Sequence, residues 1–282
     1  MIAIAQSSSG GNRPPAPPGE FVTWPALDGV DAVVTARSGG VSAGPYESLN
    51  LSLAVGDDPA SVIENRRRLA AAFGAELTDF VFARQVHGAS VRVVGDADRG
   101  SGAFTQDDAI PDTDALVTVT SGVVLAILTA DCVPIVLHDP QAGVLACVHS
   151  GWRGTVARIS AVTVHEMIKL GARPARIVAG VGPAIDPARY QVGADVHEAV
   201  TQAFGSAAGE FLRPDPASAG DRWLLDLWAA NRRVLCDAGL REQNIHVTGI
   251  PTGGDYFSDR AQRPCGRLAL AARLRPAGRP TQ

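Results

Sequence analysis

Four short hydrophobic runs follow one another in the middle of the chain with only turn residues between them: Ala115–Thr120, Val123–Thr129, Ile135–His138 and Val144–Val148. Runs of this length that are rich in β-branched residues predict neighbouring β-strands. The next segment, residues 155–170, has apolar side chains at helical spacing and predicts a helix that packs over those strands. Adjacent strands with interspersed helices indicate an α/β fold with mixed sheets arranged in layers.

Other elements of the same kinds are expected on both sides of this region. Asp57-Asp58-Pro59 predicts a helix start, because a carboxylate cap precedes a proline at the first helical position. The helix is expected over residues 61–73 and to stop at Gly74. Strands are also predicted at residues 21–36, 80–84, 90–94, 177–181 and 245–250, the last being the final strand, and helices at 192–204 and 225–238.

The composition predicts one catalytic domain over residues 21–274. Hydrophobic residues make up 46% of the 282 residues and charged residues 19%, which supplies enough apolar surface for a sizeable core. No boundary interrupts residues 21–274. Residues 1–20 are rich in Ser, Gly and Pro and predict a flexible N-terminal arm, and residues 275–282 predict a polar tail.

Charge and cysteine usage exclude several classes of protein. The net charge of −4 argues against nucleic acid as a partner, since nucleic-acid binders need a strong basic face. No run of apolar residues reaches the length of a membrane span, and the N-terminal segment lacks the positively charged start and the long apolar run of a signal peptide, so neither is expected. The four cysteines lack the close spacing of a disulfide framework. A reduced, cytoplasmic setting is therefore expected.

Three side chains at predicted strand ends suggest a metal site. Cys132 and His149 flank one strand-rich stretch, and His87 lies in the turn of Arg84-Gln-Val-His87-Gly upstream. Three protein ligands with an open fourth position are typical of catalytic zinc. The separations match no short metal motif, and a cysteine in an apolar run is usually a buried hydrophobe, which is how we interpret Cys147. Both interpretations of Cys132 stay open on spacing alone.

Two arginines beside glycines are candidate anion ligands. Arg37 precedes Ser38-Gly-Gly40, and Arg153 lies between Trp152 and Gly154. The guanidinium fork suits phosphate or carboxylate. Most surface arginines are merely solvated, and Arg153 is the stronger candidate because it follows His149 closely and lies near a helix start, where anions are favoured.

The motifs around these residues resemble the YfiH-like family, whose members have been called laccase-domain or polyphenol oxidase proteins and purine nucleoside phosphorylases. The family includes the bacterial peptidoglycan editing factor. The resemblance covers roughly residues 21–273. The motifs that carry it are Thr35-Ala-Arg-Ser-Gly-Gly-Val-Ser42, Leu49-Asn-Leu51, Val55-Gly-Asp-Asp58 with Glu64-Asn-Arg66, Gln85-Val-His87-Gly, Thr129-Ala-Asp-Cys132-Val-Pro134, Val148-His-Ser-Gly-Trp-Arg-Gly154, Gly180-Val-Gly-Pro-Ala-Ile185, and Phe257-Ser-Asp-Arg260 with Gly266-Arg267.

The resemblance implies a fold, a metal and an activity. It implies a single-domain α/β/β/α layered sandwich with zinc bound by His87, Cys132 and His149. It also implies phosphorolysis of adenosine, inosine, guanosine and S-methyl-5'-thioadenosine, and deamination of adenosine. The C-terminal motif departs from the family, which carries Cys-Thr and Phe-Phe-Ser-Tyr-Arg-Arg where this chain has Pro251-Thr252 and Tyr256-Phe-Ser-Asp-Arg260. The departure bears on substrate preference and leaves the three ligands intact.

Three functional hypotheses follow. The first is a zinc-dependent purine nucleoside enzyme, a monomer or small homo-oligomer, in which Arg153 holds phosphate and Asp131 orients a ligand. The second is a copper-dependent polyphenol oxidase. Six histidines, no His-x-His pair and only Met1 and Met167 argue against it, although copper could occupy the site adventitiously. The third is a hydrolase or editing enzyme for peptidoglycan precursors, with Cys132 as nucleophile and a histidine as base.

Overall fold

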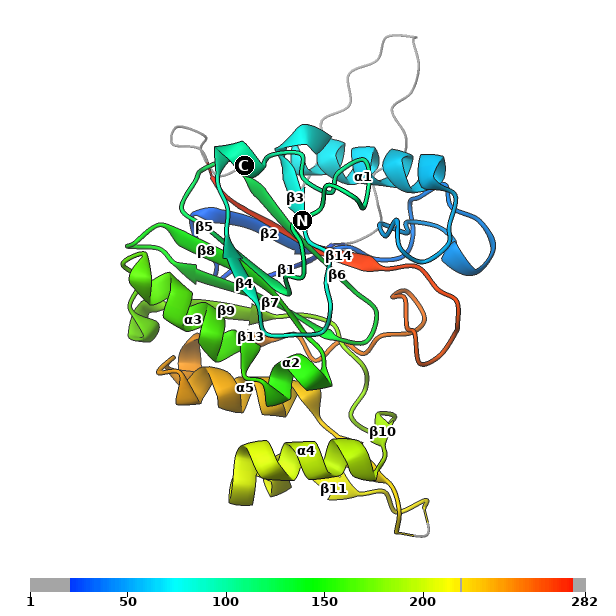
Figure 1. Cartoon of the computed structure of the whole chain (residues 1–282), viewed down its shortest axis with the longest axis vertical. Helices are drawn as coiled ribbons and strands as arrows, with labels where there is room; N and C mark the ends of the chain where they lie inside the picture. Colours follow the sequence, from blue (N-terminus) through cyan, green and yellow to red (C-terminus); the bar gives the residue numbers. More distant parts are fainter. Residues whose placement is uncertain (1–20, 219, 276–282) are drawn as a thin grey trace.

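Two mixed β-sheets pack face to face in the computed structural model, which describes residues 21–218 and 220–275 (Figure 1). Parallel and antiparallel pairs occur in both sheets. The five-stranded sheet has the order β1 (Val22–Thr23), β2 (Val30–Val34), β14 (Leu268–Leu274), β6 (Val124–Thr129) and β3 (Phe80–Phe82). The six-stranded sheet has the order β13 (Ile245–Val247), β9 (Val178–Val181), β7 (Val133–Asp139), β8 (Val144–Ser150), β5 (Ala115–Thr118) and β4 (Val91–Val93).

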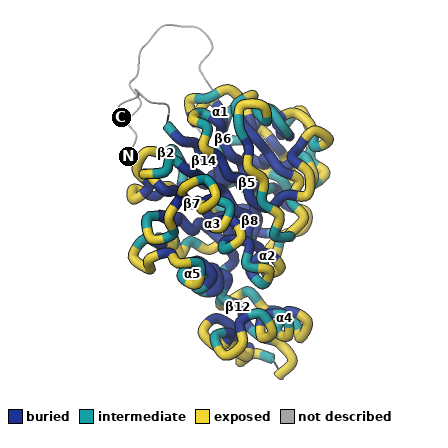
Figure 2. The backbone as a smooth tube through the Cα atoms, turned by 60° about the vertical axis from the view of Figure 1, so that its left-hand side comes forward, coloured by how far each residue is buried: buried dark blue, intermediate teal, exposed yellow. Residues whose placement is uncertain are grey.

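Alternation of side chains along the strands divides the core into layers. In β8, Leu145 and Cys147 pack against the five-stranded sheet, while Ala146 and Val148 face the opposite way. This period of two is what a pleated strand imposes. Both faces of the central strands are buried, and these strands are dark blue in Figure 2. Their sequences are therefore apolar almost throughout.

Helices cover the outer face of each sheet and complete four layers. Helix α1 (Pro59–Phe73) lies over the five-stranded sheet, and α2 (Trp152–Val156), α3 (Ile159–Lys169) and α5 (Leu227–Asp237) lie over the six-stranded sheet (Figure 1). The layered α/β/β/α prediction is therefore confirmed. No helix in the described part of the chain has the length and apolar character that a membrane crossing requires.

The caps predicted for the first helix are present. The Asp58 carboxylate accepts hydrogen bonds from the backbone N–H groups of Ala60 and Ser61, which otherwise lack helical partners. At the other end Gly74 adopts the left-handed conformation, with φ of 63°, and its N–H bonds back to the last turn. Local sequence thus determines both ends of α1.

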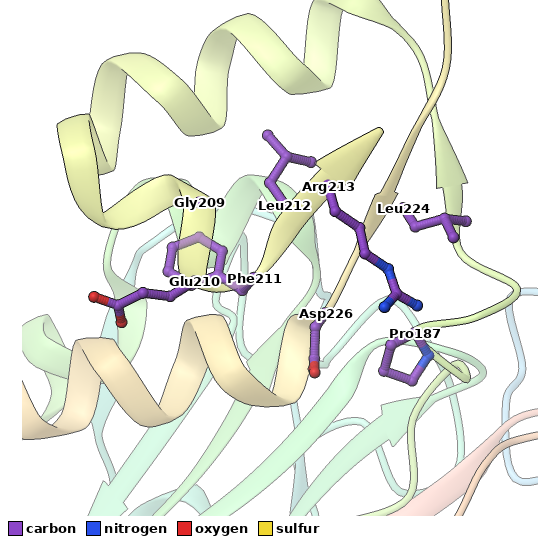
Figure 3. Close-up of a pocket in the computed structure, with 8 residues that line it drawn as sticks. All are labelled: Pro187, Gly209, Glu210, Phe211, Leu212, Arg213, Leu224 and Asp226. Carbon is purple, nitrogen blue, oxygen red and sulfur yellow. The ribbon is translucent and has the colours of Figure 1, made fainter. Parts of the chain in front are cut away.

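A lobe between β9 and α5 projects from the layered body (Figure 2). Helix α4 (Ala194–Phe204) and a 3-10 helix (Gly205–Glu210) pack with a small antiparallel sheet. A cavity of about 140 Å³ lies where this lobe meets the start of α5, lined in part by Phe211, Arg213 and Asp226 (Figure 3). The sheet consists of β10 (Gln191–Val192), β12 (Trp223–Leu225) and β11 (Leu212–Pro214).

Three sequence-based expectations were wrong. The predicted strand over residues 21–36 is two strands, β1 and β2. The helix predicted over residues 155–170 breaks at Arg158, which takes a left-handed conformation with φ of 56° and separates α2 from α3. Its side chain is held there by Asp237 at 3.0 Å and by the Phe204 ring.

The third wrong expectation was that the strand at residues 245–250 is the last. The central strand β14 follows it, built from Leu, Ala and one Arg, which favour helix when considered alone. The predicted N-terminal arm and residues 276–282 of the tail lie outside the described residues. Arg275, the first residue of that tail, is tied to Asp31 at 2.8 Å.

The position of β14 generates a stability prediction. Leu270 is fully buried between the two sheets, so Leu270→Ala should leave a cavity and lower the free energy of unfolding by about 2–5 kcal/mol. Ile168→Ala, on the exposed side of α3, should change it by less than about 0.5 kcal/mol. Denaturant unfolding of both variants provides the measurement, and equal midpoints would contradict the central placement of β14.

Candidate metal centre

Three segments that are distant in sequence bring His87, Cys132 and His149 together. His87 lies in the loop after β3, Cys132 directly precedes β7, and His149 is near the end of β8. The antiparallel ladder pairs His149 with Pro134, which places the imidazole beside the start of β7. The potential ligand atoms of the three side chains lie within 4.8 Å of one another, and the two imidazole rings are 4.7 Å apart. The structure thus assembles the predicted set.

A buried carboxylate holds two of these residues in place. Asp114, immediately before β5, accepts hydrogen bonds from the backbone N–H groups of His87 at 2.9 Å and Gly88 at 2.7 Å. It also lies 2.8 Å from Nδ1 of His149, which must be the donor because an ionised carboxylate only accepts. Nδ1 is therefore occupied, and Nε2 is the nitrogen left for a metal. Metal-binding histidines usually have such a partner.

The His87 loop is fastened at a second point by Gln85. Its side-chain amide donates to the carbonyl of Leu128 and accepts from the N–H of the same residue, both at 2.8 Å. The amide thus mimics one residue of a neighbouring strand at the end of β6. His87 itself has a left-handed backbone with φ of 60°, which is uncommon for a residue with a side chain and persists because the surrounding contacts enforce it.

Gly151 lies against the other side of the site. A Cβ atom built at this position would be 2.8 Å from the sulfur of Cys132 and 3.2 Å from the His87 ring. Its φ of −77° is ordinary, so the need for glycine here is one of space and not of backbone conformation. The bare backbone lets the thiol and the imidazole approach closely.

The charges of the site support one another. Burial disfavours ionisation of the Cys132 thiol, but the His149 and His87 imidazoles outweigh it and lower the pKa of Cys132 to about 6. Burial likewise disfavours a charged His149, yet the Cys132 thiolate and Asp114 raise its pKa to about 9. Near neutral pH the metal-free site thus holds a thiolate beside an imidazolium. A metal ion that binds Nε2 of His149 displaces the proton there.

The donor set is one that zinc can use. One thiolate and two imidazoles, with His87 on the exposed side, match the three-ligand pattern of zinc sites that keep an open position. A blue-copper site needs an additional weak axial ligand, usually methionine. Met167 is buried between α3 and the six-stranded sheet, away from this cluster, and Met1 lies outside the described residues.

The structure separates the two candidate arginines. Arg153 lies in the first turn of α2, and its exposed guanidinium rests over the Trp152 ring at 4.3 Å. Arg37 donates to the carbonyl of Glu47 at 2.8 and 3.0 Å and lies over the Phe257 ring. Arg37 is thus engaged in holding its own loop, and no contact brings it to the metal ligands.

The role expected for Asp131 belongs to another residue. Its carboxylate accepts hydrogen bonds from the Thr252 hydroxyl and the Arg260 backbone N–H, and so anchors the C-terminal loop beside Cys132. Asp114 orients the histidine instead. Sequence reasoning missed Asp114, although a carboxylate directly before a fully apolar strand was a usable signal.

Comparisons with known proteins identify a family model, relatives and solved structures that the chain resembles. The model described as multi-copper polyphenol oxidoreductase laccase matches residues 31–275. A purine nucleoside phosphorylase of Deinococcus radiodurans is 45% identical over 227 residues, 80% of this chain and 81% of its own. Adenosine deaminase RL5, from an unknown prokaryotic organism, is 41% identical over 220 residues, 78% and 83% of the two chains. The crystal structure of the hypothetical protein YfiH from Bacillus licheniformis has a TM-score of 0.87 and 34% identity, and covers 93% of this chain and 98% of that one.

The hydrogen bonds of Asp114 generate a prediction about metal affinity. Asp114→Asn removes the charge that orients His149, so zinc affinity should fall by about 10- to 100-fold. A competition titration with a chromophoric zinc chelator measures this. Asp112→Asn is the matched control, because Asp112 lies two residues away on the surface and pairs with Arg84. Equal zinc affinity of the two variants would show that Asp114 does not orient the ligand.

Proposed function

Because this chain belongs to the YfiH-like family, described as multi-copper polyphenol oxidoreductase laccase, we propose that it is a zinc-dependent purine nucleoside phosphorylase with adenosine deaminase activity. Relatives with these two enzyme names support the proposal. The proposed substrates are phosphate and adenosine, inosine, guanosine or S-methyl-5'-thioadenosine. The observation that carries the proposal is the His87, Cys132 and His149 cluster, oriented by Asp114 and open on one side.

Zinc bound by these three side chains would supply Lewis acidity, which acidifies water and stabilises developing negative charge. The chain contributes the rest. Asp114 keeps Nδ1 of His149 protonated, so that Nε2 faces the ligand cluster. Cys132 is ionised near neutral pH and needs no further proton loss to become a ligand.

Phosphorolysis requires a bound anion. An oxygen of phosphate forms a bond to C1' of the ribose while the C1'–N9 bond breaks, and the electron pair leaves with the purine, which takes up a proton. Arg153 suits the binding of phosphate, because its guanidinium is exposed and near the metal ligands in sequence and fold. In deamination, water adds at C6 of adenine and ammonia leaves. One site that binds the purine nucleoside beside the metal ligands would serve both proposed reactions.

One observation favours a second candidate. The spatial arrangement also matches a catalytic triad, with Cys132 as nucleophile, His149 as base and Asp114 as the carboxylate that orients the base. The lowered pKa of Cys132 suits a nucleophile. In this alternative Cys132 attacks a peptidoglycan precursor. The third side chain, His87, distinguishes the two, since a triad does not need it and a metal site does. A copper-dependent polyphenol oxidase is supported by the family description alone, and copper at these ligands would be adventitious.

Phosphate dependence provides the first test. Purified protein should contain about one zinc ion per chain and should cleave inosine only when phosphate is present. Arg153→Ala should raise the phosphate KM by about 10- to 100-fold, because a charge-assisted hydrogen bond contributes about 1.5–3 kcal/mol. Arg92→Ala, on the exposed edge strand β4, is the control and should leave the KM unchanged. Cleavage of inosine at the same rate without phosphate would contradict the phosphorylase assignment.

Thiol chemistry provides a second test. Zinc should protect Cys132 from iodoacetamide, whereas chelation should expose a thiol whose reactivity rises as pH increases through about 6, its pKa in the metal-free site. Cys147 is the internal control, since burial raises its pKa and it should stay unreactive in both states. Peptide mass mapping measures both thiols. Activity that survives chelation, together with alkylation of the untreated protein, would support the nucleophile instead.

A further inference from the structure

A second arginine without an acidic partner lies close to the metal ligands. Arg260 belongs to the loop between β13 and β14, and its backbone N–H donates to the carboxylate of Asp131 at 2.6 Å. Asp131 directly precedes Cys132 in the chain. The same carboxylate binds the hydroxyl of Thr252, so two points of the loop are fixed beside the thiol. The position of Arg260 therefore depends on the metal-ligand segment itself.

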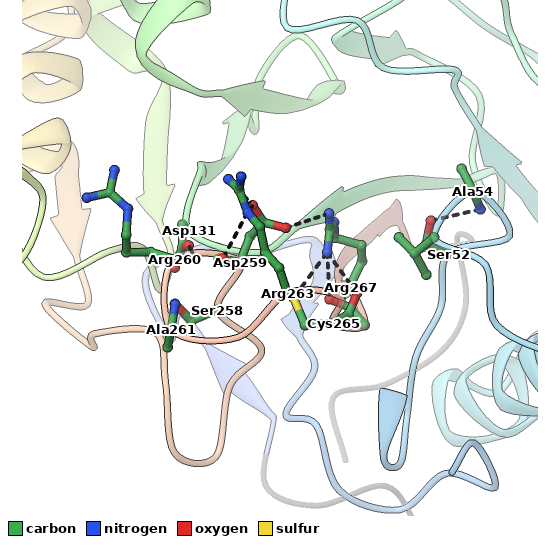
Figure 4. A network of polar contacts seen from close by, with 12 residues as sticks. Ser52, Ala54, Asp131, Ser258, Asp259, Arg260, Ala261, Arg263, Cys265 and Arg267 are labelled. Atoms are coloured by element: carbon green, nitrogen blue, oxygen red, sulfur yellow. Dashed lines mark hydrogen bonds and ion pairs between the residues drawn. The ribbon is translucent and has the colours of Figure 1, made fainter. Parts of the chain in front are cut away.

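The side chain of Arg260 extends away from the acidic residue next to it. Asp259 is paired with Arg263 and Arg267, whereas the guanidinium of Arg260 points to the opposite side (Figure 4). It lies over the Tyr190 ring at 5.2 Å and donates to the carbonyl of Gln191 at 3.0 Å. Among the described residues, no carboxylate lies within ion-pair distance of Arg260 or of Arg153.

Tyr190 is the aromatic side chain that contacts Arg260. Burial raises the pKa of its phenol, and the negative charge of Cys132 raises it further, while Arg260 and Arg153 act in the opposite direction. The guanidinium of Arg260 lies over the same ring, so it is close to this hydroxyl. That hydroxyl stays protonated at neutral pH and remains available as a hydrogen-bond donor.

We propose that Arg260 is a second phosphate-binding residue, which together with Arg153 holds the anion beside the metal ligands, with Tyr190 as an additional donor. This inference rests on the proposed function. Two guanidinium groups without carboxylate partners match the charge of inorganic phosphate, and planar forks bind its oxygens in pairs. The backbone bond to Asp131 and the Tyr190 ring restrict Arg260 before the anion arrives, which lowers the entropy cost of binding.

A purely structural role for Arg260 makes a different prediction. If the guanidinium served only to fasten Gln191, its loss would lower stability and affect all substrates alike. Phosphate binding must therefore be measured separately from turnover, by calorimetric titration of the zinc-loaded protein with inorganic phosphate. Arg263→Ala is the matched control, because Arg263 lies in the same loop, is 75% exposed and is paired with Asp259.

We expect Arg260→Ala to weaken phosphate binding by about 10- to 100-fold and to raise the phosphate KM equally, with the inosine KM, zinc content and Tm close to those of Arg263→Ala. Arg260→Lys should recover part of the binding, since it keeps the charge but not the fork. Unchanged phosphate affinity in Arg260→Ala, or an equal rise in both KM values, would overturn the proposal. If the unmodified protein binds phosphate through Arg260 but cleaves no nucleoside, the anion site stands and the proposed reaction fails.

Discussion

The buried carboxylate of Asp114 is the interaction on which the site depends. Burial alone would raise its pKa, but the His149 imidazole and the backbone N–H groups of Gly88 and Val86 more than compensate and hold that pKa below its usual value. A buried charge is tolerated only when it is fully hydrogen-bonded, and here every bond also orients a component of the site. The loop that carries His87 and the strand that carries His149 are joined through one residue that directly precedes a third strand, β5.

The fold could be predicted from sequence where local signals and burial agree. The strands from residue 115 to residue 148 and the capped helix α1 were predicted because their patterns are decided by pleating and by the capping of backbone N–H groups. Strand β14 could not be predicted, because its Leu and Ala residues adopt a strand only through pairing with β2 and β6 on either side. Tertiary pairing overrides local propensity there.

Some residues of the site could likewise be predicted from the sequence, and others could not. Side-chain chemistry indicated His87, Cys132 and His149, since few residue types bind zinc. It favoured Arg153 over Arg37 but did not indicate Arg260, because the availability of an arginine depends on partners that are distant in sequence. Arg37 binds a carbonyl of its own loop, and Arg66 is buried among three backbone carbonyls. Arg153 and Arg260 look no different in sequence, yet in the described part of the chain each has no carboxylate within ion-pair distance and neither is buried among backbone carbonyls as Arg66 is.

The empty space at Gly151 has a consequence for how such sites are recognised in other chains. The motif Val148-His-Ser-Gly-Trp-Arg-Gly154 contains one ligand, but it also requires a residue without a side chain, because a Cβ atom at position 151 would lie only 2.8 Å from the Cys132 sulfur. A homologous chain could therefore keep both histidines and the cysteine and still lack a working centre. A search for the three ligand residues alone would classify such a chain as a metalloprotein. The residue at position 151 would show whether the chain can form the metal site.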